Sequence, residues 1–285
     1  MARELRTVGV VGLGTMGAGI AQVAVLAGNE VVGREVSDEL NERARGRIDH
    51  FLGRAVEKGR LDATAKDAAL GRLRTTTDLA ELAGCDLVIE AIVEELEPKR
   101  ELFAELDRIC APDAILATNT SALSVTEIAE ATQRPGRVIG MHFFNPAPVL
   151  PLVEIVRTEH SDAAAVDAAY AWAERAGKRP VRCNDTPGFI VNRILIPLLN
   201  DCVRVLDEAD VTPEDLDKAM TNGAGWPMGP CALVDLVGID IHVHASAALH
   251  GKLGEPRMAP PERLLAMQAE GKLGRKSGEG FYRYE

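Results

Sequence analysis

The feature that most constrains the fold of this chain is a glycine-rich loop near its start. The apolar run Val8–Val11 leads into the pattern G-x-G-x-x-G, and the stretch Met16–Ala27, which has helical periodicity, follows it. Gly12 permits a tight turn, Gly14 lets a pyrophosphate approach the backbone, and Gly17 allows the helix to pack close to the strand. Because the motif stands between a strand and a helix, it predicts a dinucleotide-binding loop made of Gly12, Leu13, Gly14, Thr15, Met16 and Gly17.

An acidic residue stands at the end of the next predicted strand, Glu30–Glu35. Glu35 follows Gly17 by eighteen residues, and a carboxylate at that spacing can accept hydrogen bonds from both ribose hydroxyls. Glu35 therefore favours NAD over NADP, which carries a 2′-phosphate. Gly33 and Arg34 interrupt the apolar strand just before it, and Arg34 could meet such a phosphate. We predict a nicotinamide cofactor, with NAD preferred and NADP left open.

Short apolar runs alternate with helical patterns through the first two thirds of the chain, which is typical of a parallel sheet covered by helices. The predicted strands are Thr7–Gly12, Glu30–Glu35, Asp86–Ile92, Ala114–Asn119, Arg137–His142, Leu152–Val156 and Pro180–Cys183. Residues 37–72 predict a charged helical hairpin that turns near Gly59. The predicted fold class is α/β, with a Rossmann-type doubly wound sheet in residues 1–185 and a C-terminal all-helical domain in residues 186–285.

The second domain is predicted from helical signals alone. A long apolar helix over residues 189–209 contains Pro197. Thr212 followed by Pro213 predicts an N-cap with proline at the first helical position, and the pair at 229–230 predicts another helix start.

Composition excludes several function classes. A net charge of −11 over 285 residues disfavours binding to nucleic acid or to an anionic membrane. The five cysteines form no C-x-x-C pair and no apolar run reaches membrane-spanning length, so we expect a cytoplasmic protein with reduced thiols. The histidine cluster of His242, His244 and His250 has no cysteine or carboxylate at ligand spacing, so no metal site is predicted.

Polar residues gather where the predicted strands end. In an open α/β sheet, ligands bind beyond the carboxyl ends of the strands. The sequence places Glu94, Asn119, Ser121 and His142 there. Each alone is an ordinary turn or packing residue, but together they are expected to converge on one crevice.

His142 and Glu154 form a candidate acid–base pair. Glu154 stands in the apolar run Leu152–Val156, which follows His142 after a short segment rich in proline, so the two side chains can lie side by side. A carboxylate on one ring nitrogen would fix the tautomer and stabilise the imidazolium formed when the other nitrogen takes a proton. Oxidation of an alcohol by hydride transfer needs such a base, because the hydroxyl proton leaves as the hydride does.

Six segments spread over nearly the whole chain carry a resemblance to a known family. They are G-L-G-T-M-G-A-G-I-A at 12–21, E-A-I-V-E at 90–94, T-N-T-S at 118–121, H-F-F-N-P at 142–146, D-T-P-G-F-I-V-N-R at 185–193 and G-E-G-F-Y at 278–282. In these segments the chain resembles the 3-hydroxyacyl-CoA dehydrogenases, and within them the stand-alone bacterial 3-hydroxybutyryl-CoA dehydrogenases.

The resemblance implies an activity and a set of roles. It implies interconversion of (S)-3-hydroxyacyl-CoA and 3-oxoacyl-CoA, with His142 as general base, Glu154 as its partner, and Ser121 and Asn192 bonded to the substrate oxygen. It further implies a homodimer formed through the helical domain. The residues implied to line the NAD site beside the glycine loop and Glu35 are Glu94, Lys99, Asn119, Asn145 and Lys276.

The predicted hairpin carries a basic surface. Residues 41–60 contain six basic and three acidic side chains in a chain that is acidic overall, and Arg54 and Lys58 stand four residues apart on one helical face. Such faces are usually just solvated. Coenzyme A carries a pyrophosphate and a 3′-phosphate, and the family uses this hairpin for coenzyme A, so Arg54 and Lys58 are its candidate contacts.

Two other functions remain open. A β-hydroxyacid dehydrogenase of the 3-hydroxyisobutyrate type shares the glycine loop but needs a catalytic lysine in a glycine-rich helix, which the sequence does not show. A non-catalytic, crystallin-like dinucleotide-binding protein would have no need of His142, Glu154, Ser121 and Asn192 together.

Overall fold

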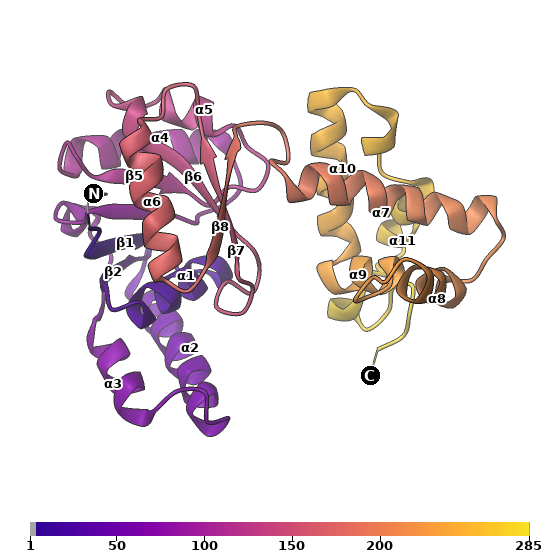
Figure 1. Cartoon of the computed structure of the whole chain (residues 1–285), viewed down its shortest axis with the longest axis horizontal. Coiled ribbons are helices and arrows are strands. Elements are labelled where there is room, and N and C mark those ends of the chain that lie inside the picture. The colour runs from indigo at the N-terminus through magenta and orange to yellow at the C-terminus, as the bar shows by residue number, and fades with distance from the viewer. Residues whose placement is uncertain (1–3, 285) are drawn as a thin grey trace. The chain divides into compact units, whose positions relative to one another are not determined.

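The computed structural model describes residues 4–284, and its first part is built on one eight-stranded sheet (Figure 1). The strands are β1 (Thr7–Val11), β2 (Glu30–Arg34), β3 (Leu73–Thr76), β4 (Leu87–Glu90), β5 (Ile115–Thr118), β6 (Val138–Phe143), β7 (Leu152–Arg157) and β8 (Arg179–Asn184). Their order is β3-β2-β1-β4-β5-β6-β7-β8, and every neighbouring pair is parallel except β6–β7. The chain changes direction across the sheet between β1 and β4, which is where such sheets bind ligands.

Helices cover both faces of this sheet because its central strands are apolar on both sides. The helices are α1 (Thr15–Leu26), α2 (Asp38–Glu57), α3 (Ala63–Gly71), α4 (Leu96–Ile109), α5 (Val125–Ala129) and α6 (Ala163–Arg175). On one face Ile20, Ile48 and Trp172 bring α1, α2 and α6 into one buried cluster with the strands. On the other face Phe103 and Ile128 do the same for α4 and α5.

The predicted doubly wound sheet is confirmed, and all seven predicted strands are present within two residues of their predicted ends. The sequence reasoning missed β3, because its segment Leu-Arg-Thr-Thr has only one apolar side chain. Its strand character comes from pairing with β2, where Leu73 stands opposite Val31.

The hairpin predicted at 37–72 consists of α2 and α3, which extend together from the sheet (Figure 1). Ser37 caps α2 by accepting a hydrogen bond from the Leu40 amide. Gly59 has a φ of 63° at the turn, a left-handed conformation that suits glycine.

The chain divides into two compact units between Thr186 and Pro187. The second unit consists of helices and short turns: α7 (Val191–Glu208), α8 (Pro213–Gly223), α9 (Pro230–Val237), α10 (Ile239–Leu253) and α11 (Glu262–Ala269). Leu199, Val234 and Leu264 join α7, α9 and α11 in its core. Thr212 caps α8 by accepting a hydrogen bond from the Asp215 amide, and Pro230 begins α9.

Two aspartates hold the C-terminal segment of this unit. The carboxylate of Asp235, 1% exposed, accepts hydrogen bonds from the amides of Phe281 and Tyr282 and from the Tyr284 hydroxyl. Asp217 accepts a bond from the Tyr282 hydroxyl. A Cβ on Gly280 would stand 2.1 Å from Asp235 Oδ1. The G-E-G-F-Y motif therefore has a structural role, because it places residues 281–284 against Asp235 and Asp217.

A buried polar network joins α7 to α10. Asn200 Oδ1 lies 2.8 Å from His242 Nε2 and accepts a bond from Ser246, and all three side chains are buried. Burial lowers the pKa of His242 to about 4, so the imidazole is neutral at pH 7.

Within residues 4–284, no single helix is both long and apolar enough to cross a membrane. Among the helices of the described residues, α9 and α10 taken together reach that length and composition, and they meet at a bend of 95°.

Candidate functional site

The glycine loop joins β1 to α1 and requires glycine at two positions, for its backbone conformation at one and for lack of space at the other. Gly12 has a φ of 83°, and its amide donates to the Arg34 carbonyl at 2.9 Å. A Cβ on Gly17 would stand 1.7 Å from the Gly12 carbonyl oxygen, so no larger residue fits there. The loop lies at the crossover between β1 and β4, since the Ala91 amide donates to the Val11 carbonyl.

Glu35 is tied to this loop by its carboxylate. Oε1 accepts a hydrogen bond from the Leu13 amide at 2.6 Å, and Oε2 accepts one from the Val36 amide at 3.1 Å. The two amides orient a half-buried carboxylate beside the loop.

The structure explains the interruption of β2 by Gly33 and Arg34. A Cβ on Gly33 would stand 2.8 Å from a methyl group of Leu13, so glycine makes room for a side chain of the loop. Arg34 Nε donates to the Thr77 carbonyl at 3.3 Å, which ties the guanidinium to the protein.

A buried ion pair supports the ends of β4 and β5. Lys99 Nζ lies 2.5 Å from Glu90 Oε1, and the side chains are 1% and 0% exposed. Glu90 also accepts bonds from the Ile92 amide and the Thr118 hydroxyl, each at 2.7 Å. Lys99 reaches Glu94 Oε2 at 3.3 Å. Lys99 thus holds Glu94 from within the protein rather than presenting its own charge at the surface.

Glu94 in turn organises the loop after β5. Its Oε1 accepts hydrogen bonds from the Thr120 hydroxyl at 2.6 Å and the Ser121 amide at 2.7 Å, and from the Ser121 hydroxyl at 3.2 Å. Burial raises the pKa of Glu94, but the Lys99 charge and these hydrogen bonds outweigh it, so the net pKa lies below its usual value. Glu94 is therefore ionised at neutral pH and holds Ser121 in place.

His142 and Glu154 stand opposite each other on the antiparallel strands β6 and β7. Glu154 Oε2 lies 2.7 Å from His142 Nδ1, and the residues are 0% and 6% exposed. The carboxylate favours a proton on Nδ1, which leaves Nε2 as the basic nitrogen. Asn119 links this pair to the preceding strand end, because its Oδ1 accepts the Phe143 amide at 2.9 Å.

The loop and the start of α1 fit a dinucleotide. A Cβ on Gly14 would meet no atom within 4 Å among residues 4–284, so internal packing does not require glycine there, whereas close approach of a phosphate does. The first turn of α1 has no acidic residue and Gly14 supplies no side-chain cap, so its amides suit an anion.

Comparison with known proteins agrees with this arrangement. Residues 7–186 match the family described as "3-hydroxyacyl-CoA dehydrogenase, NAD binding domain", and residues 188–284 match its C-terminal domain. The chain belongs to the 3-hydroxyacyl-CoA dehydrogenase family.

Individual relatives cover the whole chain. The chain is 47% identical over 286 residues to a 3-hydroxybutyryl-CoA dehydrogenase of Mycobacterium tuberculosis, covering 100% of both chains. It is 42% identical to the human mitochondrial hydroxyacyl-coenzyme A dehydrogenase, covering 99% of this chain and 92% of that one. The crystal structure of M. tuberculosis FadB2 aligns with a TM-score of 0.96 and 47% identity, covering 99% of this chain and 100% of that one.

Two further predicted site residues of this 3-hydroxyacyl-CoA dehydrogenase family member, Asn192 and Lys276, lie in the helical unit. Asn192 is half-buried in the first turn of α7. Lys276 lies in a short 3-10 turn (Arg275–Ser277), with its ammonium 2.6 Å from Asp240 Oδ2. Asn145 is exposed in the segment after β6.

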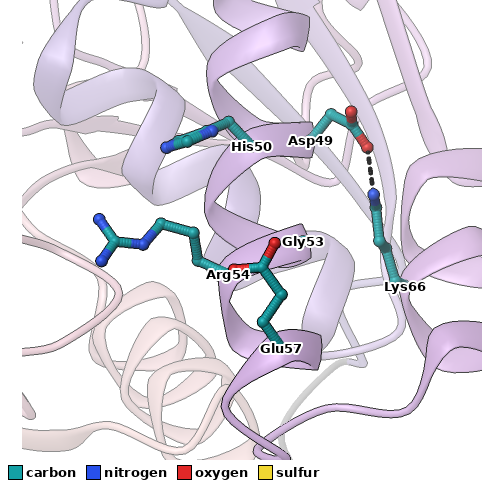
Figure 2. A pocket seen from close by; sticks show the side chains of 6 residues that line it. All are labelled: Asp49, His50, Gly53, Arg54, Glu57 and Lys66. Carbon is teal, nitrogen blue, oxygen red and sulfur yellow. Dashed lines mark ion pairs between the residues drawn. The ribbon is translucent and has the colours of Figure 1, made fainter.

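The hairpin of this family member carries a shallow pocket of about 330 Å³ (Figure 2). Its lining consists of Asp49, His50, Gly53, Arg54, Glu57 and Lys66. Lys66 is paired with Asp49 at 2.7 Å, while the Arg54 side chain extends away from that pair (Figure 2). Lys58 is exposed just beyond the end of α2 and does not line this pocket, so the structure brings only one of the two predicted coenzyme A contacts to it.

Sequence reasoning missed the buried residues that hydrogen-bond to one another and to the predicted site residues Lys99 and Glu94. Glu90 pairs with Lys99, the Thr118 hydroxyl donates to Glu90, and the Thr120 hydroxyl donates to Glu94; all three residues are buried. A signal for Glu90 was present, because an acid in an otherwise apolar strand requires a partner. Nothing local showed that the partner would be Lys99, nine residues later.

Proposed function

We propose that the chain interconverts (S)-3-hydroxyacyl-CoA and 3-oxoacyl-CoA, with short-chain 3-hydroxybutyryl-CoA as its substrate. The observation that carries this proposal is the buried pair of His142 and Glu154, in which His142 stands near the carboxyl end of β6, in the same sheet as the strand that leads into the glycine loop. Family membership and the name of the M. tuberculosis relative support the substrate.

In the proposed reaction, different side chains of the site transfer the proton, stabilise charge and bind the substrate oxygen. A bound nicotinamide would supply the acceptor or donor of the hydride that is exchanged with carbon 3 of the substrate. His142 Nε2 takes the hydroxyl proton as the hydride leaves, and Glu154 stabilises the resulting imidazolium through Nδ1. Ser121 and Asn192 donate hydrogen bonds to the substrate oxygen. Glu94 keeps the Ser121 hydroxyl at the end of β5.

The deciding experiment compares three alcohols in the presence of NAD. NADH formation is followed with 3-hydroxybutyryl-CoA, with free 3-hydroxybutyrate and with 3-hydroxyisobutyrate. We expect turnover of the thioester alone. Turnover of 3-hydroxyisobutyrate would instead favour a β-hydroxyacid dehydrogenase, and no turnover of any of them would favour a non-catalytic binding protein.

For the cofactor we propose NAD, held by the glycine loop and Glu35, with Glu94, Asn119, Asn145 and Lys276 completing the site and Lys99 acting through Glu94. The Glu35 carboxylate is fixed beside the loop, where it can bind ribose hydroxyls and repel a 2′-phosphate. The bond from Arg34 to the Thr77 carbonyl also supports NAD, because it engages the guanidinium that could otherwise favour the 2′-phosphate of NADP.

Replacing Glu35 with Ser is expected to narrow the preference for NAD over NADP. The change removes the repulsion of the 2′-phosphate and the bonds to the ribose, so kcat/KM for NADH falls while that for NADPH rises. Steady-state kinetics with both cofactors measure this, with the exposed Glu39→Ser as a control. A wild-type preference for NADPH would show that Arg34 governs the pocket.

Arg54 and Lys58 are proposed to contact the phosphates of coenzyme A. The double change Arg54→Ala/Lys58→Ala should raise KM for acetoacetyl-CoA, since each charge-assisted contact contributes about 1.5–3 kcal/mol. Acetoacetyl-pantetheine, which lacks the nucleotide phosphates, should be turned over as by wild type.

The matched control is Arg43→Ala/Arg108→Ala, which removes the same charge from two exposed positions outside the pocket. Equal losses of kcat/KM with acetoacetyl-CoA and with acetoacetyl-pantetheine in the Arg54/Lys58 variant would indicate a damaged fold. No loss on either would show that this basic face is only solvated.

We also propose that the helical unit forms a homodimer. It exposes large aliphatic side chains on several helices, with Ile194 at 61%, Ile241 at 53% and Leu236 at 48%. Contact with a second copy of the chain would remove these apolar side chains from water.

A further inference from the structure

The segment 144–151, which connects β6 to β7, is held by contacts from outside itself. It follows the strand that carries His142 and precedes the strand that carries Glu154. Three of its eight residues are prolines, which have no amide to donate. Within the segment, the amides of Val149 and Leu150 both donate to the Pro146 carbonyl. Other carbonyls of the segment need donors from elsewhere in the protein.

Lys178 supplies those donors. Its ammonium donates to the Ala147 carbonyl at 2.5 Å and to the Leu150 carbonyl at 3.0 Å. The residue is 8% exposed, and it takes part in none of the lysine–carboxylate ion pairs formed among residues 4–284. Burial lowers the pKa of Lys178. A buried ammonium without a counter-ion is costly, and here its compensation comes from the two carbonyls.

The segment also packs against α1. A Cβ on Gly19 would stand 3.1 Å from Pro148 Cδ and 3.2 Å from Ala147 Cβ, so glycine lets the segment approach the helix that follows the dinucleotide loop. Ala147, which takes part in both of these contacts, is 2% exposed.

The segment matters because its first residues stand beside the acid–base pair. The ring of Phe144 lies 4.5 Å from that of His142, centroid to centroid. Asn145 follows it and is a proposed cofactor contact.

We infer that Lys178 is a positioning residue: by holding the carbonyls of Ala147 and Leu150, it sets the place of Phe144 and Asn145 at the site. This inference rests on the proposed function for its effect on turnover, but the contacts themselves do not depend on it.

The test uses Lys178→Met, which keeps the length of the side chain and removes the donors. Hydrogen exchange of the Val149 and Leu150 amides should become at least about tenfold faster, since two charge-assisted bonds are lost. kcat with acetoacetyl-CoA and NADH should fall roughly 10- to 100-fold, the usual effect of misplacing a reacting group, while KM for acetoacetyl-CoA stays near wild type. The control is Arg179→Met, which removes an exposed cation at the next position. This variant should match wild type in both measurements.

Gly19→Ala provides a second approach to the same segment. Alanine favours the helix, so the fold is retained, while its methyl group displaces Ala147 and Pro148. We expect kcat of Gly19→Ala to fall by less than that of Lys178→Met. Circular dichroism at the assay temperature should show that both variants are fully folded.

The outcomes separate the inference from the proposed function. Unchanged hydrogen exchange of the Val149 and Leu150 amides in Lys178→Met would show that Lys178 does not hold the segment. Faster exchange with an unchanged kcat would show that Lys178 supports the segment structurally but does not position the site, which would overturn the inference. A wild-type enzyme inactive on acetoacetyl-CoA would contradict the proposed function, while the exchange measurement would still decide whether Lys178 holds the segment.

Discussion

Replacing His142 with Gln is expected to lower kcat by about two to four orders of magnitude, the usual contribution of a positioned acid–base group. Glutamine can still donate a hydrogen bond to Glu154, so the buried carboxylate keeps a partner and the fold is retained. NADH binding, followed by fluorescence titration, should be nearly unchanged because the dinucleotide loop lies on other strands.

The control is His244→Gln, since His244 is exposed on α10. Glu154→Gln should also lower kcat, because an amide orients the imidazole but stabilises its charged form less. A His142→Gln enzyme that turned over at near the wild-type rate would remove the basis of the proposed mechanism.

Replacing Lys99 with Met is expected to destabilise the first unit by about 3–5 kcal/mol, the usual effect of removing one partner of a buried ion pair. Glu90 would keep its bonds from Ile92 and Thr118 but lose the ammonium 2.5 Å away, in a site that is 0% exposed. Denaturant unfolding measures the change through the fluorescence of Trp172, in a Trp226→Phe background that leaves one tryptophan.

Two variants make this result specific. Arg100→Met removes a neighbouring cation whose partner, Glu97, is exposed, and its effect should stay below about 1 kcal/mol. The double change Glu90→Gln/Lys99→Met removes both charges and should recover much of the loss. If Lys99→Met alone unfolded at the wild-type denaturant concentration, the pair would contribute nothing measurable to stability.

Local sequence was sufficient for the features that depend on backbone geometry and periodicity. The glycine loop could be predicted because a tight turn and a close helix leave no room for a Cβ at Gly17. The sheet could be predicted because buried parallel strands are apolar runs separated by helical segments. The exception was β3, whose four residues carry little apolar signal and depend on pairing with β2.

In the candidate site, too, some features could be predicted from local sequence and others required the tertiary structure. Residues at strand ends, such as His142 and Ser121, could be placed near one another because the topology of an open sheet brings strand ends to one edge. That Glu154 bonds Nδ1 of His142 required the antiparallel register of β6 and β7. The reason for Gly33 in its strand also required the tertiary structure, because the Leu13 side chain occupies the space that a Cβ would fill.

By itself, then, the sequence determined the order of strands and helices, the dinucleotide loop and the strand ends that carry polar side chains, because these follow from local sterics and from the spacing of apolar residues. Only the tertiary structure decided which polar groups meet. The pairing of Lys99 with Glu90, the contact of Lys178 with the segment 144–151 and the absence of Lys58 from the lining of the hairpin pocket all join or separate residues through packing. Contacts of this kind depend on the positions of whole elements, which no local pattern encodes.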